Sequence, residues 1–113
     1  DWLNAGCLMQ VDAGCVLGRL GKGSQLASER IIKNGWCHFL GSDSHDNKKR
    51  NFCLSDAYNT VSTWIGESET KKMVYDNPRS IIDNLPISVD FDYEDNHEES
   101  IFNAITKMIR SKF

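Results

Sequence analysis

Long apolar runs, a surplus of positive charge and paired cysteine motifs are all missing from this chain of 113 residues. No apolar run approaches the roughly 20 residues that a membrane-spanning helix needs, so we expect no membrane insertion. The formal net charge of −3 argues against nucleic acid as a partner, because nucleic-acid-binding domains usually present a basic face. The lack of a Cys-x-x-Cys pair excludes a zinc ribbon.

The four cysteines that are present show no pairing pattern. Cys7, Cys15 and Cys37 lie in or beside apolar stretches, so we expect small buried hydrophobic residues with reduced thiols, typical of a cytoplasmic protein. No cysteine is followed six positions later by Arg, the spacing that a cysteine-based phosphatase needs around its thiolate. Any phosphatase chemistry in this chain is therefore expected to depend on a metal.

Hydrophobic patterning predicts a strand, a helix and a second strand in the first part of the chain. The apolar run over residues 7–11 is typical of a buried strand. A loop punctuated by glycines follows, and helical spacing then runs over residues 24–34, with Gly35 as a left-handed end. Residues 36–42 are the second predicted strand. Two strands joined through one helix form a parallel crossover, so the predicted class is α/β.

Further helices are predicted after a polar loop over residues 46–53. They cover residues 56–65, capped by Ser55, then residues 67–75, and then a short segment that begins at Asn77-Pro78 and ends by Leu85-Pro86. Beyond this point we predict a small strand over 87–91, an exposed acidic segment over 90–99 and an amphipathic helix over 101–113.

The second predicted strand leads directly into Asp-Ser-His at residues 43–45. Side chains two positions apart in an extended segment point to the same face, so Asp43 and His45 can bind one ion. Carboxylate oxygen and neutral imidazole suit manganese, iron or zinc. By strand parity Asp43 shares a buried face with Cys37, Phe39 and Gly41, where a charge needs a partner such as a cation. The structural alternative is that Asp43 caps the next turn and His45 forms hydrogen bonds at the surface.

Arg50 follows in a basic loop and can bind a phosphate through parallel N–H bonds. A run of basic residues is usually solvated, and this is the interpretation we prefer for Lys48 and Lys49. His38 has the opposite strand parity from Asp43, so we expect a structural histidine that packs against helices.

Several motifs occur together in an order that resembles a known family. The stretches Ala-Gly-Cys-Leu-Met-Gln-Val-Asp-Ala-Gly at 5–14 and His-Phe-Leu-Gly-Ser-Asp-Ser-His at 38–45 are similar to bacterial PHP-type (polymerase and histidinol phosphatase) protein-tyrosine phosphatases of capsular and exopolysaccharide operons. Gly18 to Gly21, Ser-Asp-Ala-Tyr at 55–58 and Asn-Pro-Arg-Ser-Ile-Ile at 77–82 extend the resemblance. It covers roughly residues 1–85, whereas residues 87–113 match nothing in the family pattern.

The resemblance implies that residues 1–85 are the C-terminal part of a distorted TIM-like (β/α)7 barrel, followed in residues 86–113 by the acidic segment and an extra terminal helix. It implies a cluster of divalent metal ions, expected to be Mn²⁺, with Asp43 and His45 as ligands and Arg50 in contact with the phosphate. The implied reaction is hydrolysis of phosphotyrosine on a partner tyrosine autokinase that controls capsular or exopolysaccharide synthesis.

The family's His-x-His pair, acidic ligands and middle histidine are missing from this sequence. We therefore expect a piece of a longer protein that is inactive alone. The sequence also departs from the family pattern at Asp46, where asparagine is expected, and at Asn51-Phe52, where prolines are expected. Two alternatives stay open: another PHP-family phosphoesterase that acts on a small-molecule phosphate, and a non-catalytic half-barrel that binds a partner. A homo-oligomer is compatible with each of these hypotheses.

Overall fold

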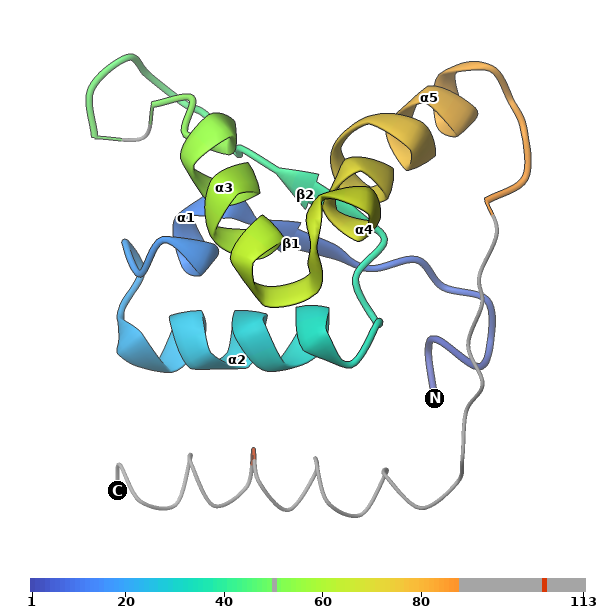
Figure 1. Cartoon of the computed structure of the whole chain (residues 1–113), viewed down its shortest axis with the longest axis horizontal. Coiled ribbons are helices and arrows are strands. Elements are labelled where there is room, and N and C mark those ends of the chain that lie inside the picture. The colour runs from blue at the N-terminus through green and yellow to red at the C-terminus, as the bar shows by residue number, and fades with distance from the viewer. Residues whose placement is uncertain (50, 88–104, 106–113) are drawn as a thin grey trace.

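The computed structural model of the chain describes residues 1–49, 51–87 and 105. Short helices pack against one face of a small sheet (Figure 1), so the predicted α/β class is confirmed. The predictions for residues 88–113 lie outside the described residues, except that Ile105 is helical and half exposed. In chain order the elements are β1 (Gln10–Asp12), α1 (Ala13–Val16), α2 (Lys22–Lys33), β2 (Phe39–Gly41), α3 (Leu54–Ile65), α4 (Glu67–Lys71), the π-helix η1 (Lys72–Asp76) and α5 (Asn77–Ile82).

The two strands of the described part pair in parallel, with α2 in the connection between them, as the patterning predicts. Both strands are shorter than the apolar runs over 7–11 and 36–42. A strand extends only as far as a neighbouring backbone accepts and donates its hydrogen bonds, and apolar residues beyond that length have no partner in the ladder. In the register, Gln10 lies opposite Phe39, Val11 opposite Leu40 and Asp12 opposite Gly41.

The helix α1 falls in the stretch that the sequence indicates as a loop. The carboxylate of Asp12 caps it by accepting a hydrogen bond of 2.8 Å from the backbone N–H of Gly14. Ala13 and Val16 are completely buried. Their burial stabilises a turn whose own helix propensity is weak, which is why local sequence alone does not predict it.

The boundaries of the later helices follow glycine and proline closely. Gly66 has a φ of 90°, a left-handed value that favours glycine, and it separates α3 from α4. Pro78 lies in the first turn of α5, as predicted. The prediction that Ser55 caps α3 is wrong: α3 begins at Leu54, and the preceding Cys53 makes no capping hydrogen bond. Cys53 is buried in the core, so packing fixes the position at which the helix begins.

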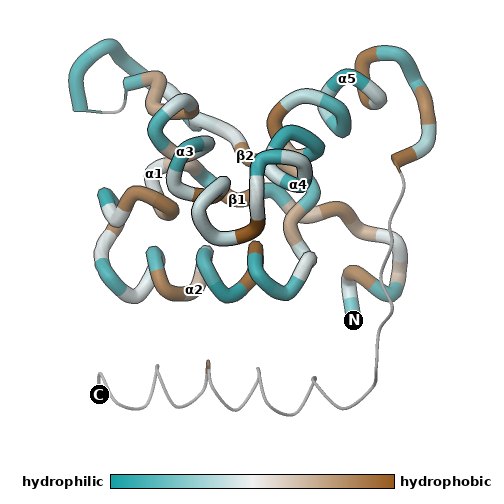
Figure 2. Tube along the Cα trace, in the orientation of Figure 1, coloured by the Kyte–Doolittle hydropathy of each residue, from teal (hydrophilic) through white to brown (hydrophobic). Residues whose placement is uncertain are grey.

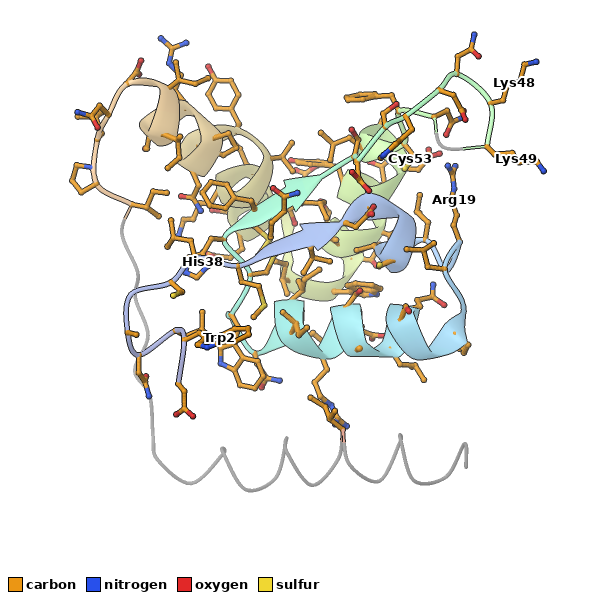
Figure 3. All side chains as sticks on the ribbon, turned by 180° about the vertical axis from the view of Figure 1, so that it is seen from behind. Trp2, Arg19, His38, Lys48, Lys49 and Cys53 are labelled. Atoms are coloured by element: carbon orange, nitrogen blue, oxygen red, sulfur yellow. The ribbon has the colours of Figure 1, made fainter. Side chains whose placement is uncertain are left out.

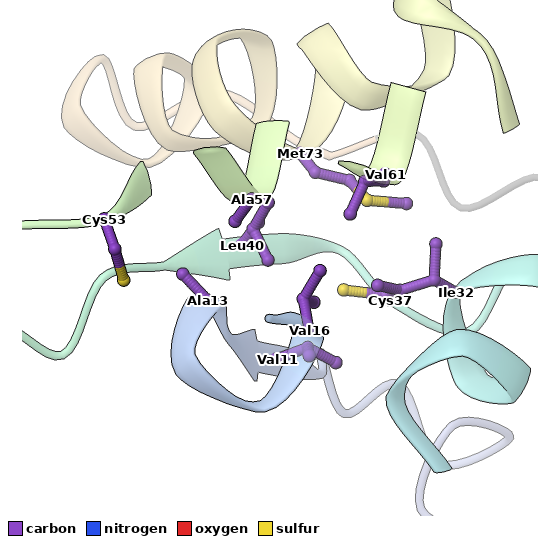
Figure 4. Packing of buried hydrophobic residues seen from close by; sticks show 10 residues of the cluster. All are labelled: Val11, Ala13, Val16, Ile32, Cys37, Leu40, Cys53, Ala57, Val61 and Met73. Atoms are coloured by element: carbon purple, nitrogen blue, oxygen red, sulfur yellow. The ribbon is translucent and has the colours of Figure 1, made fainter. Parts of the chain in front are cut away.

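The hydrophobic core lies between the helices and one face of the sheet (Figure 4). On α2, hydrophobic residues recur between hydrophilic ones (Figure 2), as a helix with one buried side requires. Every element from β1 to α3, together with η1, contributes to this core. Its buried members are Val11, Ala13, Val16, Ile32, Cys37, Leu40, Cys53, Ala57, Val61 and Met73.

The two faces of β2 differ in burial in a way that corrects one sequence-based prediction. His38 and Leu40 are almost inaccessible, whereas Phe39 and Gly41 are only half-buried. The helices therefore cover the face that carries His38 and Leu40, as expected for His38. Asp43 is exposed, so the expectation that it ends a buried face is wrong.

His38 joins three parts of the chain. Its ring Nδ1 accepts a hydrogen bond of 2.9 Å from the backbone N–H of Met9. Its carbonyl oxygen accepts a hydrogen bond of 2.8 Å from the side-chain amide of Asn77, the first residue of α5. The structural role predicted for His38 is confirmed.

We expect the stability of the fold to decrease as the pH falls from 7.5 to 5. Burial lowers the pKa of His38 below its ordinary value of 6.5, so the unfolded chain binds a proton in this range more readily than the folded chain does. The stability that the neutral ring confers is therefore present above pH 6.5 and is lost as the pH falls below it. The measurement is urea unfolding at the two pH values.

The matched variant is His38→Asn, which keeps a hydrogen-bond acceptor near the position of Nδ1 but does not titrate. The urea midpoints of unfolding at the two pH values should differ less in this variant than in the parent chain. His45→Asn, at an exposed position, should leave the difference unchanged. A pH dependence that His38→Asn does not reduce would contradict the prediction.

Candidate metal site

The carboxyl ends of both strands point toward the loop that follows β2, where Lys48 and Lys49 are labelled (Figure 3). Parallel strands bring their carboxyl ends to one edge of the sheet, and binding sites of α/β proteins usually form there. Asp43 and His45 lie at the beginning of this loop, within five residues of β2. Their position is therefore the one at which a functional site is expected.

Asp43 has a left-handed backbone conformation, with a φ of 47°. This region is unfavourable for most side chains, and aspartate and asparagine tolerate it best apart from glycine. The turn brings the backbone oxygen of Asp43 to 2.7 Å from Nδ1 of His45. Non-glycine residues in such conformations are concentrated at functional sites.

The contact between His45 and the carbonyl of Asp43 determines the tautomer of the ring. A carbonyl oxygen can only accept a hydrogen bond, so Nδ1 of His45 carries the proton and donates it. In the neutral ring, Nε2 then has a lone pair that can bind a metal ion. Metal-binding histidines are typically oriented in this way, with one ring N–H donated to a carbonyl or carboxylate.

The two side chains lie close together and are open to solvent. Nδ1 of His45 is 3.9 Å from Oδ1 of Asp43, and about half of each side chain is exposed. A carboxylate and an imidazole are two of the ligand types that divalent cations bind. In the described part of the chain, no group of three or more His, Cys, Asp or Glu residues is arranged to hold a metal. A complete coordination sphere needs further ligands.

The basic loop after His45 is held at two points. Oδ1 of Asp46 accepts a hydrogen bond of 2.7 Å from the backbone N–H of Lys48. Nη1 of Arg19 donates a hydrogen bond of 2.7 Å to Oδ1 of Asn51, 32 positions further along the chain. The sequence analysis missed Arg19, because no local pattern predicts a contact over this separation. Lys48 and Lys49 are exposed, as predicted, and Arg50 lies outside the described residues.

Two of the four cysteines, Cys15 and Cys37, are poorly suited to act as nucleophiles. All four thiols are free; Cys37 and Cys53 are buried, Cys15 is partly buried, and Cys7 is exposed, contrary to the prediction. Burial raises the pKa of Cys37 to about 11, and burial together with the charge of Asp12 raises the pKa of Cys15. Thiols that stay protonated near neutral pH are poor nucleophiles.

Comparisons with known proteins relate the chain to phosphatases. A family model described as capsular polysaccharide synthesis, CpsB/CapC, matches residues 1–83. The tyrosine-protein phosphatase YwqE of Bacillus subtilis is 30% identical over 82 residues, which are 73% of this chain and 32% of YwqE. CapC of Staphylococcus aureus is 32% identical over 59 residues, which are 52% of this chain and 23% of CapC.

A solved structure gives the same relationship in three dimensions. It comes from work on YwqE of Bacillus subtilis and CpsB of Streptococcus pneumoniae, described as unique metal-dependent tyrosine phosphatases. The TM-score is 0.65 at 26% identity, over 70% of this chain and 32% of the other. The chain thus spans about a third of the length of this relative. Within residues 1–49, 51–87 and 105, no helix has both the length and the apolar character that crossing a bilayer requires.

Proposed function

The chain belongs to the capsular polysaccharide synthesis family CpsB/CapC, and on that premise we propose that it forms part of the metal site of a metal-dependent protein-tyrosine phosphatase. The observation that carries the proposal is the pair Asp43 and His45 at the end of β2. One side chain offers a carboxylate, and the other has its Nε2 left open by the hydrogen bond of Nδ1. The proposed substrate is phosphotyrosine on a partner tyrosine autokinase in the cytoplasm.

We infer that residues 1–85 are the C-terminal part of a distorted (β/α)7 barrel, with residues 86–113 added to it. The parallel unit of β1, α2 and β2 supports this, because strand, helix and parallel strand form the repeating unit of such barrels. The half-exposed face of the sheet supports it too, because purely parallel sheets are normally covered on both faces. In a barrel, Phe39 and Gly41 would face the interior.

The residues of this chain have separate roles in the proposed site. Asp43 and His45 would hold a divalent cation, expected to be Mn²⁺, together with ligands from outside the described residues. Bound metal ions would supply an activated water and neutralise charge on the phosphoryl oxygens. Arg50 would hold the phosphate, because its planar guanidinium donates two parallel hydrogen bonds to phosphate oxygens. The backbone carbonyl of Asp43 would keep His45 in the tautomer that binds the metal.

The experiment that tests the proposal uses a chimera in which residues 1–83 replace the matching segment of YwqE. With Mn²⁺ present, we expect the chimera to hydrolyse a phosphotyrosine peptide, because it combines Asp43 and His45 with the ligands of the relative. EDTA should abolish this activity and added Mn²⁺ should restore it. The 113-residue chain alone should show no turnover above background, because two ligands cannot hold a metal cluster.

Circular dichroism establishes that the chimera is folded before its activity is interpreted. A folded chimera without activity, or one whose activity survives EDTA, would contradict the proposal. So would a kcat/KM that is higher for histidinol phosphate than for the phosphotyrosine peptide, because it would indicate a small-molecule phosphatase.

A further inference from the structure

We propose that the loop after His45 and the adjoining turn recognise phosphotyrosine in peptides whose flanking residues are acidic. The inference rests on the proposed function for the phosphotyrosine itself and adds the sequence context that is preferred. It is carried by exposed cations at the end of the molecule where the candidate metal site lies, and by an exposed aromatic ring in the same loop. This surface, which we call the basic rim, consists of Arg19, Lys48, Lys49 and Phe52.

The members of the basic rim are brought together by a contact between distant segments. Arg19 lies in the turn between α1 and α2, and its hydrogen bond of 2.7 Å to Asn51 joins this turn to the loop. Phe52 is the next residue after Asn51. Figure 3 shows Arg19, Lys48 and Lys49 at the same end of the molecule, beyond the carboxyl ends of the strands. The rim therefore borders the position of Asp43 and His45.

The cations of the rim form no side-chain ion pair with another described residue, although the carboxylate of Asp46 accepts a hydrogen bond from the backbone N–H of Lys48. Lysines on the helices form ion pairs with carboxylates, at 2.6 Å for Lys33, 3.0 Å for Lys71 and 2.8 Å for Lys72. In residues 1–49 and 51–87, neither Lys48 nor Lys49 has a carboxylate within ion-pair distance. Arg19 binds the neutral amide of Asn51. A surface of this kind attracts acidic groups and raises their association rate.

Phe52 points outward although both of its neighbours are held in place. Asn51 is bound by Arg19, and Cys53 is buried in the core. The side chain of Phe52 is 69% exposed, so it contributes little to the stability of the fold. An exposed aromatic ring in a loop that also carries cations is suited to stacking on the ring of phosphotyrosine. Phosphoserine has no ring, so this contact would favour phosphotyrosine.

The chemistry of the loop favours an acidic peptide over a nucleic acid as the ligand. The carboxylates of Asp43 and Asp46 are exposed in the same loop, and the chain as a whole has a net charge of −3. A nucleic acid would bring a continuous row of phosphates against these carboxylates. A peptide with a single phosphate can place that group near the metal site and its flanking carboxylates on the rim.

The test measures binding of a fluorescein-labelled nonapeptide, with a central phosphotyrosine between Asp and Glu residues, to the whole chain by fluorescence anisotropy. EDTA is present and the salt concentration is low, so that binding reports on the rim. We expect Lys48→Glu with Lys49→Glu to weaken binding about tenfold, because the variant repels the acidic flanks. The control, Lys71→Glu with Lys72→Glu, makes the same change of charge elsewhere and should alter affinity less than about twofold.

The aromatic contribution is tested with a second pair of variants. Phe52→Ala should weaken binding of the phosphotyrosine peptide about threefold to tenfold and leave the phosphoserine version of the peptide unaffected. Tyr75→Ala is the control, because Tyr75 is another exposed aromatic residue, at 61%. It should leave binding of both peptides unchanged.

The proposal is overturned if the control lysine variant weakens binding as much as the rim variant does. It is also overturned if the phosphoserine peptide, or a single-stranded oligonucleotide of the same charge, binds as tightly as the phosphotyrosine peptide. These outcomes are distinct from failure of the proposed function. An inactive but folded chimera would contradict the proposed phosphatase activity. The binding data would still decide which peptides the basic rim prefers.

Discussion

Asp43→Asn is expected to lower the kcat/KM of the YwqE chimera for a phosphotyrosine peptide at least about a hundredfold, since loss even of outer-shell partners costs metal sites ten- to a hundredfold. Asparagine has nearly the same shape as aspartate and tolerates the left-handed φ of 47° that this position requires. The substitution therefore removes the negative charge and leaves the turn intact. The measurement is manganese-dependent release of phosphate.

Asp46→Asn is the matched control for this prediction. It makes the same chemical change three positions away, and the amide oxygen can still accept the hydrogen bond from the backbone of Lys48. We expect its kcat/KM to stay within about threefold of the parent chimera, as for a surface charge outside the metal site. Undiminished turnover in Asp43→Asn, or an equal loss in both variants, would remove Asp43 from the proposed metal site.

Ile32→Ala is expected to lower the free energy of unfolding by about 3 kcal/mol, the middle of the range for large aliphatic residues in a well-packed core. Among the described residues, Ile32 is the largest fully buried side chain, at 1% exposure, and it belongs to the core between α2 and the sheet. Truncation removes its packing contacts and leaves a cavity. Domains are usually stable by only about 5–15 kcal/mol, so urea unfolding should show a large shift of the midpoint.

Ile82→Ala provides the control with an identical substitution. Ile82 is the last residue of α5 and is 76% exposed, so its replacement should change the free energy of unfolding by less than about 0.5 kcal/mol. An equal decrease in the free energy of unfolding of both variants would show that α2 does not pack against the core as the structure describes.

The sequence by itself determined the elements that depend on the spacing of nearby residues or on the backbone preference of a single residue. Hydrophobic spacing placed α2 at residues 24–34, against the observed Lys22–Lys33, because a helix with one buried side repeats its apolar residues every three to four positions. Gly35, with a φ of 75°, and Pro78 marked helix boundaries because their backbone preferences act at a single residue. Ordered motifs also indicated the family, since they can be recognised without knowledge of packing.

Tertiary structure alone decided the features that depend on residues far apart in the chain. Burial of Ala13 and Val16 produces α1, the pairing with β1 limits β2 to three residues, and Arg19 meets Asn51 across 32 positions. The exposure of Asp43 and Cys7 was predicted wrongly for the same reason. Periodicity shows which side chains share a face, but the burial of that face depends on what packs against it.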